Sequence, residues 1–275
     1  KGFKGGNYSR AETMRKYGRY FEFTWVNMKT KDKTRGLGPK IDMQKNIRFV
    51  WHKYFIKFDI KINSIKNDDF IGSVKDGGAV NFREILINPH GNMTHTESVG
   101  HISQEEINVN KLLQTHHFIA QLITIKPQKI SINNKKGKKE VDEIISLNQI
   151  KNKILPNIQA LIIRSQKNYD ELTNKNYSYT NWPFLAESSA AYIRNKGVQH
   201  LLIDQPSIDK EFDEGKLLAH RAFWNYPNEI DLKKTITELI GIPDHIKDGR
   251  YLLNLSLANI ENDAVPSRPI IYKLF

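Results

Sequence analysis

The chain has 275 residues, of which 39% are hydrophobic and 26% charged, with a formal net charge of +12 and no cysteine. This composition excludes an intrinsically disordered chain, a disulfide-stabilised scaffold and a zinc site built on thiolates. No apolar run approaches the roughly 18 residues of a membrane-spanning helix, and no secretory signal is recognisable. We therefore expect a protein of the cytoplasm or an organelle matrix that is not secreted and does not enter a membrane.

The excess of positive charge lies at the N-terminal end of the chain. Residues 1–66 hold 17 Lys and Arg against 5 Asp and Glu, whereas residues 67–275 hold 25 of each. Residues 1–44 also carry scattered glycines and an aromatic patch between Tyr17 and Trp25, a composition that cannot build its own core. We predict a basic N-terminal extension over residues 1–44 that packs onto the body or a sister subunit. Contact of this extension with RNA, or with a larger assembly, is the alternative.

Strands are predicted over much of the remaining chain. Alternation from Tyr54 to Ile62 predicts a half-buried strand. Further segments rich in Ile and Leu predict strands over 84–88, 118–126, 159–164, 199–203, 235–240, 251–257 and 269–274.

Helices are fewer than strands. A capping box at Ser103 and Glu106 predicts a short helix that runs towards Leu113. Apolar residues at helical spacing predict two more helices, over 139–154 and 184–196. Strands interleaved with a few helices, with no further shift in composition, predict one mixed α/β domain over residues 45–275.

Residues 90–101 concentrate side chains that bind metals. They read HGNMTHTESVGH and contain three of the nine histidines together with one carboxylate. Borderline divalent ions such as zinc and manganese take imidazole nitrogens and carboxylate oxygens. The surrounding Gly, Ser and Thr residues allow a loop in which these side chains converge. Spacing alone fits a metal-binding loop and a polar loop with histidines of no special role equally well.

The same segment resembles the metal-binding signature of the cyclase family that includes bacterial kynurenine formamidase and isatin hydrolase. The family pattern is approximately HxGTHxDxPxH, and His95 and His101 match its second and last His. Glu97 replaces the Asp, and Met93 stands where Gly is usual. His90 lies one residue further upstream than the first His of the pattern.

Three later blocks resemble the same family in the same order. Residues 200–220 resemble a segment in which Asp-Thr-x-Ser-x-Asp precedes a His, and residues 237–239 resemble a segment that supplies a metal-binding Glu. Residues 262–268 resemble the closing Asp-Gly-x-Pro-x-Arg. The resemblance covers about residues 80–275 and implies a compact, swivelling β/β/α fold that forms a homo-oligomer.

Carried over position by position, the resemblance implies a site for one or two zinc or manganese ions. The implied metal ligands are His90, His95, Glu97, His220 and Glu238. His101 is the implied acid–base residue or an additional ligand. Ser207 is either a substrate contact or a turn residue, and Arg268 either a substrate clamp or a structural ion-pair residue. Asp204 and Asp209 are expected to cap turns or to fix histidine tautomers.

The function that this resemblance implies is hydrolysis of a C–N bond in a small amide, formamide or lactam. A bound metal ion lowers the pKa of water and polarises a carbonyl, so metal-bound hydroxide would attack while a histidine carries the proton. The alternative is an enzyme-derived scaffold subunit of a larger RNA-containing or organellar assembly, attached through residues 1–44.

Overall fold

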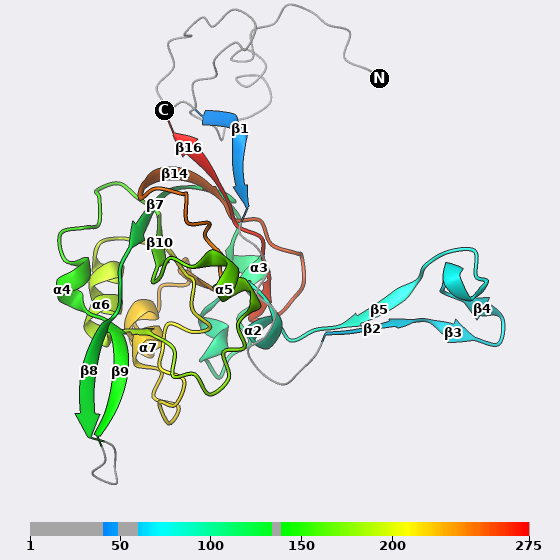
Figure 1. Cartoon of the computed structure of the whole chain (residues 1–275), viewed down its shortest axis with the longest axis horizontal. Coiled ribbons are helices and arrows are strands. Elements are labelled where there is room, and N and C mark those ends of the chain that lie inside the picture. The colour runs from blue at the N-terminus through cyan, green and yellow to red at the C-terminus, as the bar shows by residue number, and fades with distance from the viewer. Residues whose placement is uncertain (1–40, 49–59, 134–138, 275) are drawn as a thin grey trace, which may run out of the picture.

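A nine-stranded sheet runs through the described part of the chain, which comprises residues 41–48, 60–133 and 139–274 of a computed structural model (Figure 1). The strand order is β1 (Ile41–Arg48), β16 (Ile270–Leu274), β14 (Gly249–Asn254), β7 (His117–Thr124), β10 (Ala160–Arg164), β12 (His200–Ile203), β13 (Thr235–Glu238), β6 (His95–Glu97) and β15 (Ala264–Pro266). The four strands β7, β10, β12 and β13 run parallel, and the other neighbours pair antiparallel.

Two helices pack on one face of the parallel strands. Helix α6 (Glu187–Asn195) precedes β12, and α7 (Leu218–Trp224) lies between β12 and β13. Parallel neighbours need crossover connections of this kind. In β10, Leu161 and Ile163 face the core that includes α6 and α7, whereas Ala160 and Ile162 face the core on the opposite side. Burial on both faces explains why these four consecutive residues are all apolar.

Smaller elements complete the described structure. A second sheet has the order β11 (Phe184–Leu185), β9 (Lys139–Ile145) and β8 (Gln128–Asn133). A separate arm contains β2 (Lys61–Ser64), β3 (Lys66–Asn67), β4 (Phe70–Ile71), the 3-10 helix η1 (Val74–Asp76) and β5 (Arg83–Leu86). The short helices are α2 (Pro89–Asn92), the 3-10 helix η2 (Val99–His101), α3 (Val109–Leu112), α4 (Leu147–Ile150) and α5 (Tyr169–Asn174). Within this part of the chain, no helix has the length and apolar character needed to cross a bilayer.

The mixed α/β fold class and most of the predicted strands are confirmed. The strands predicted over 84–88, 118–126, 159–164, 199–203, 235–240, 251–257 and 269–274 correspond to β5, β7, β10, β12, β13, β14 and β16, with ends that differ by up to three residues. The helix predicted over 184–196 corresponds to α6. Gly197 follows it with a φ of +80°, the left-handed conformation that ends helices and favours glycine.

Two predicted helices are wrong. Residues 139–145 form strand β9, which pairs antiparallel with β8, and only Leu147–Ile150 are helical in the segment predicted over 139–154. Its few apolar residues fit both periods, so the pairing with β8 decides the structure. The helix predicted from Ser103 is absent because the Ser103 hydroxyl accepts a hydrogen bond from the Glu105 N–H at 3.0 Å, which closes a local turn. Helix α3 begins only at Val109.

The predicted N-terminal extension lies mostly outside the described residues. Residues 41–44 belong to β1, which pairs with β16, so the boundary predicted after residue 44 falls within a strand. The strand predicted over 54–62 also lies outside the described residues, apart from 60–62. Strand β2 begins at Lys61, and Ile62 is 55% exposed, in contrast to the half-buried position that we predicted.

We expect the central strands to set the stability of the fold. Ile162 of β10 is completely buried, so Ile162→Ala should lower the free energy of unfolding by about 2–5 kcal/mol and Ile162→Val by about 0.5–1.5 kcal/mol. Urea titrations of the two variants measure this difference. Leu232, which is 45% exposed, is the control, and Leu232→Ala should change the stability by less than about 0.5 kcal/mol. Equal losses at the two positions would contradict the placement of the core.

Candidate metal centre

Strand β6 places two of the predicted ligands on one face of the sheet. Alternate residues of a strand point the same way, so His95 and Glu97 share a face, and both are completely buried. The pairing with β13 puts Glu238 directly opposite His95. The loop that we predicted for residues 90–101 is therefore wrong over His95–Glu97, where hydrogen bonds to β13 and β15 hold an extended strand.

The opposite face of β6 is closed by hydroxyl groups. The Thr96 hydroxyl lies 2.8 Å from that of Thr237 and donates a hydrogen bond to the Ser267 hydroxyl at 2.9 Å. These contacts link β6 to β13 and to the residue that follows β15. They oppose a one-residue slip of the register, which would turn His95 and Glu97 away from the site.

The Glu97 carboxylate lies at the centre of four imidazole rings. Its Oε1 is 3.0 Å from Nε2 of His220 on α7. Its Oε2 is 3.2 Å from Nδ1 of His90 on α2 and 3.9 Å from Nε2 of His95. The same oxygen is 3.8 Å from Nδ1 of His101, which ends η2. Residues from four separate elements thus converge on one buried charge.

Glu238 faces the same group from the neighbouring strand. Its Oε2 lies 3.5 Å from His95 Nε2, and its Oε1 lies 3.5 Å from His220 Nε2. The backbone N–H of Ile208 donates to Oε1 at 2.8 Å, which fixes the orientation of the carboxylate. The structure therefore brings together all six residues predicted as ligands or acid–base residue. Below, the six residues His90, His95, Glu97, His101, His220 and Glu238 are called the His/Glu cluster.

Two aspartates outside the cluster form hydrogen bonds with its histidines. Asp209 Oδ2 is 2.6 Å from His220 Nδ1, and the Asp209 carboxylate also accepts hydrogen bonds from the backbone N–H groups of Ala219 and His220. The expectation that Asp209 caps a turn or fixes a tautomer is confirmed. Asp263 Oδ2 is 2.8 Å from His90 Nε2 and 3.6 Å from His101 Nδ1. Sequence reasoning assigned no role to Asp263, although it stands at the Asp of the closing block.

The donor atoms of this centre fit a divalent ion. Three overlapping groups each have their donor atoms within 4.8 Å of one another: His90, His95 and Glu97; His90, His101 and Asp263; and Glu97, His101 and His220. His95 Nε2 is buried and has no hydrogen-bond partner. Buried polar atoms without partners are costly, and imidazole and carboxylate donors are those that zinc and manganese accept.

Protons balance the carboxylates in the absence of an ion. Burial opposes the charged form of His90, but hydrogen bonds to Asp263 and Glu97 outweigh it and raise the pKa of His90 to about 10. Burial likewise opposes protonation of His220, but its contacts with Asp209 and Glu97 raise its pKa well above the ordinary value. Burial also opposes ionisation of Glu97, yet the charge of His101 and hydrogen bonds from His220 and His90 keep its pKa well below the ordinary value.

The two predicted substrate contacts, Ser207 and Arg268, lie close in the chain to residues that contact or pair with the cluster. The Ser207 hydroxyl accepts a hydrogen bond from the Asp209 N–H at 3.1 Å, which closes a local turn. The turn includes Ile208, whose backbone N–H donates to Glu238. Arg268 is exposed and lies two residues after Pro266, which pairs with His95. Contact of Ser207 or Arg268 with substrate stays a prediction. Asp204, which we expected to cap a turn or to fix a histidine tautomer, instead binds the segment that follows β10, since its Oδ2 accepts a hydrogen bond from the Ser165 N–H at 2.8 Å.

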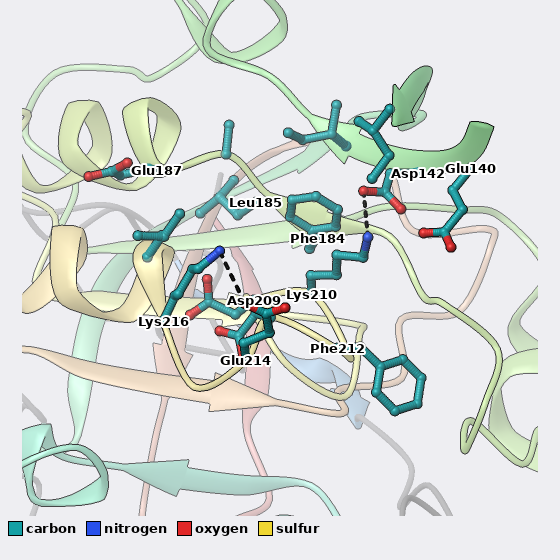
Figure 2. Close-up of a pocket in the computed structure, with 15 residues that line it drawn as sticks. Glu140, Asp142, Phe184, Leu185, Glu187, Asp209, Lys210, Phe212, Glu214 and Lys216 are labelled. Atoms are coloured by element: carbon teal, nitrogen blue, oxygen red, sulfur yellow. Dashed lines mark hydrogen bonds and ion pairs between the residues drawn. The ribbon is translucent and has the colours of Figure 1, made fainter. Parts of the chain in front are cut away.

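A pocket of about 470 Å³ lies between β9, β11 and residues 209–218 (Figure 2). Phe184 and Phe212 contribute to its apolar lining, and an ion pair of 2.8 Å joins Lys210 to Asp142 at one wall. Asp209 lines this pocket and also hydrogen-bonds to His220, whereas no residue of the His/Glu cluster lines it. The pocket therefore borders the cluster through Asp209.

Comparison with known proteins relates most of the chain to one family. A family model described as "Putative cyclase" matches residues 21–210, a range that begins within the predicted extension and ends before His220 and Glu238. A kynurenine formamidase from Bacillus cytotoxicus is 36% identical over 93 residues, which make up 34% of this chain and 41% of the relative. The match thus spans about two fifths of the length of that curated relative.

Solved structures share the fold at low sequence identity. A predicted metal-dependent hydrolase from Bacillus stearothermophilus has a TM-score of 0.55 at 14% identity, over 83% of this chain and 98% of that one. Isatin hydrolase A from Labrenzia aggregata, bound to benzyl benzoate, has a TM-score of 0.57 at 11% identity, over 83% and 93% of the two chains. At such identities the likeness establishes the fold, which is the one that the sequence resemblance implied.

We expect the metal-free protein to lose stability as the pH rises from about 6.5 to about 10. The pKa of His90 is raised in the folded state, so its contribution is complete below the ordinary value near 6.5 and is lost as the pH passes through about 10. One such group changes the free energy of unfolding by at most about 1.4 kcal/mol per pH unit. Urea titrations in chelator at several pH values measure the slope.

The Asp263→Asn variant tests which contact causes this slope. This variant removes the negative charge next to His90, so the free energy of unfolding should fall less steeply with pH. The contribution of His220 to the pH dependence should remain. Asp244, which is exposed and lies outside the centre, provides the control, and Asp244→Asn should keep the wild-type slope. An unchanged slope in Asp263→Asn would contradict the assigned role of Asp263.

Proposed function

Because the chain belongs to the cyclase family, we propose that it is a metal-dependent hydrolase that cleaves a C–N bond in a small amide, formamide or lactam. The observation that carries the proposal is the completely buried Glu97 carboxylate, which faces four imidazole rings. The similarity to a kynurenine formamidase supports a formamide as the substrate class, and the shared fold with isatin hydrolase A is compatible with a lactam.

We place the ion among the inward-facing donors. His90, His95 and Glu97 would hold one zinc or manganese ion, and Glu97 with His220 would hold a second where two are bound. Glu238 lies near both of these proposed ion positions, because its Oε2 is beside His95 and its Oε1 is beside His220. When bound, the ion would polarise the scissile carbonyl and lower the pKa of water.

His101 is the residue that we assign to proton transfer. Its side chain is 31% exposed, whereas those of His95 and His220 are at most 1% exposed. Its ring lies over that of His90, with centroids 4.2 Å apart, so it forms the edge of the cluster that is accessible from outside. An imidazole in this position can accept a proton from water and return it to the leaving nitrogen.

The remaining residues orient these groups. Asp209 and Asp263 bind one ring nitrogen of His220 and His90, respectively, and leave the other nitrogen directed at Glu97. Carboxylates in this position fix the tautomer of a metal-binding histidine and increase its basicity. Ser207 and Arg268 are the side chains that we propose to contact the substrate.

We expect zinc or manganese affinity to rise with pH. Two raised histidine pKa values mean that an ion must displace about two protons, on His90 and His220. The association constant should then increase about 100-fold per pH unit while both rings are protonated. Titration calorimetry in buffers of different ionisation enthalpy counts the released protons.

Matched variants connect this affinity to the cluster. Glu97→Gln keeps the shape of the side chain but removes its charge, and it should weaken ion binding by roughly 100-fold or more. His245 is exposed and lies outside the cluster, so His245→Asn should bind as the wild type does. Wild-type affinity in Glu97→Gln would remove the basis of the proposed site.

Replacement of His101 separates proton transfer from ion binding. The ion-loaded His101→Ala variant should retain its metal content, measured by mass spectrometry, but hydrolyse an N-formyl aromatic amide about 10²–10⁴-fold more slowly than the wild type. A parallel loss of metal would identify His101 as a ligand. Failure of the ion-loaded wild type to hydrolyse any formyl amide or lactam would overturn the proposed function.

A further inference from the structure

A second concave site borders the His/Glu cluster, and no step of the proposed hydrolysis uses it. It is the pocket of about 470 Å³ that reaches His220 only through Asp209, and its volume is typical of sites for small molecules. Strands β8, β9 and β11 contribute to its lining, together with the start of α6 and residues 209–218 (Figure 2). Acidic side chains predominate among its charged groups, so we call it the acidic pocket.

Apolar side chains in the acidic pocket are left partly uncovered. Ile144 of β9 lies opposite Phe184 of β11, and both side chains line the cavity. In the segment 209–218, Phe212 and Leu218 also line it and are 61% and 46% exposed. Covering such surface with the apolar part of a ligand is favourable. The pocket can therefore hold an apolar or aromatic group.

The two lysines of the acidic pocket are already paired with its own acids. Lys210 Nζ lies 2.8 Å from Asp142 Oδ2, and Lys216 Nζ lies 3.7 Å from Glu214 Oε2 (Figure 2). The first of these pairs is well buried, because the Asp142 side chain is 4% exposed and that of Lys210 19%. An anionic ligand would have to displace a carboxylate to reach either ammonium group, so the lining does not favour an anion.

The remaining charged groups of the lining are all carboxylates. In total, six lining side chains are acidic and two are lysines, which leaves an excess of four negative charges. One of the four belongs to Asp209, whose Oδ2 is 2.6 Å from His220 Nδ1. The other three belong to Glu140, Glu187 and Asp213. A concave surface with charges of one sign raises the local concentration of ions of the opposite sign.

We propose that the acidic pocket binds a small organic ammonium ion with an apolar or aromatic body. The ammonium group would lie among the carboxylates, and the body would cover the apolar side chains. The rings of Phe184 and Phe212 line the same cavity and favour a cation over a neutral molecule, since the face of an aromatic ring carries partial negative charge.

A metal ion is a poorer match to this pocket than an organic cation. Within the described part of the chain, the groups of side chains whose donor atoms are close enough to hold an ion all belong to the His/Glu cluster or include Asp263. None of them contains a residue of the acidic pocket. A bare ion would also leave the apolar lining in contact with water. The combination of spread carboxylates and apolar side chains therefore selects a larger ligand with one charged end.

Asp209 connects the acidic pocket with the metal centre. Its Oδ1 accepts a hydrogen bond from the Ala219 N–H at 2.7 Å, and its Oδ2 lies beside the His220 ring. An ammonium ion in the pocket and a divalent ion held by His220 would both be stabilised by this one carboxylate and would repel each other. Each should therefore weaken the binding of the other by the same factor. This coupling rests on the proposed function, whereas binding in the pocket does not.

Titration calorimetry of the metal-free full chain tests the ligand class. The probe 2-phenylethylammonium should bind with a Kd of about 1 mM or lower. 2-Phenylethanol and phenylacetate have the same aromatic body with no charge and with a negative charge, and both should bind about tenfold more weakly or worse. Absence of binding by 2-phenylethylammonium, or equal binding by the alcohol, would overturn the proposal.

Paired substitutions locate the binding site. Glu140→Gln/Glu187→Gln removes two exposed charges from the lining and should raise the Kd of 2-phenylethylammonium about tenfold. Glu229→Gln/Asp244→Asn removes two exposed charges outside the pocket and should keep the wild-type Kd. Thermal unfolding verifies that both variants are folded. An unchanged Kd in the pocket variant, or an equal rise in the control, would overturn the placement of the ligand.

The same titration with zinc bound measures the coupling through Asp209. Saturating zinc should raise the Kd of 2-phenylethylammonium about fivefold, with the bound metal determined by mass spectrometry. An unchanged Kd in protein that contains zinc would overturn the coupling. Absence of bound zinc would instead overturn the proposed metal centre, and binding of 2-phenylethylammonium to the metal-free protein would still support the acidic pocket as a separate site.

Discussion

A carboxylate buried among imidazoles is the constraint on which the rest of the site depends. Glu97 is inaccessible to solvent, and an isolated charge in such a place costs several kcal/mol. The fold offsets this cost with rings from α2, β6, η2 and α7, and it then holds two of those rings with outer aspartates. Two protons and one divalent ion carry the same charge, so the cluster is balanced when the rings are protonated and also when an ion replaces the protons.

The sheet converts this electrostatic requirement into fixed geometry. β6 is only three residues long, but it is paired on both edges, and its register places His95 opposite Glu238. Glu238 ends the parallel strand β13, just as Arg164 ends the otherwise apolar strand β10, so charged groups gather at the carboxyl ends of these strands. Ligand sites of open α/β sheets commonly occupy this edge.

The parts of the structure that could be predicted from sequence are those with a strong local pattern or a recognisable motif. The segment 159–164 was predictable because burial on both faces requires an uninterrupted apolar run. β6 was not, since His-Thr-Glu has no apolar period and is extended only because both neighbours pair with it. The ligand set rested on family resemblance, because spacing alone left residues 90–101 undecided. Asp263 was missed because it lies 173 residues from His90 in the chain, and only the fold brings them within 2.8 Å.

The centre consists of a rigid half and a half that depends on short connecting elements. His95, Glu97 and Glu238 are strand residues with paired backbones, and their side chains are at most 5% exposed. His90, His101 and Asp263 come from a single-turn helix, a 3-10 turn and a strand entrance, and their side chains are 26–31% exposed. An ion needs donor atoms at precise positions. A substrate needs an accessible side of the centre, where a proton can be transferred. The division between strand and loop supplies both.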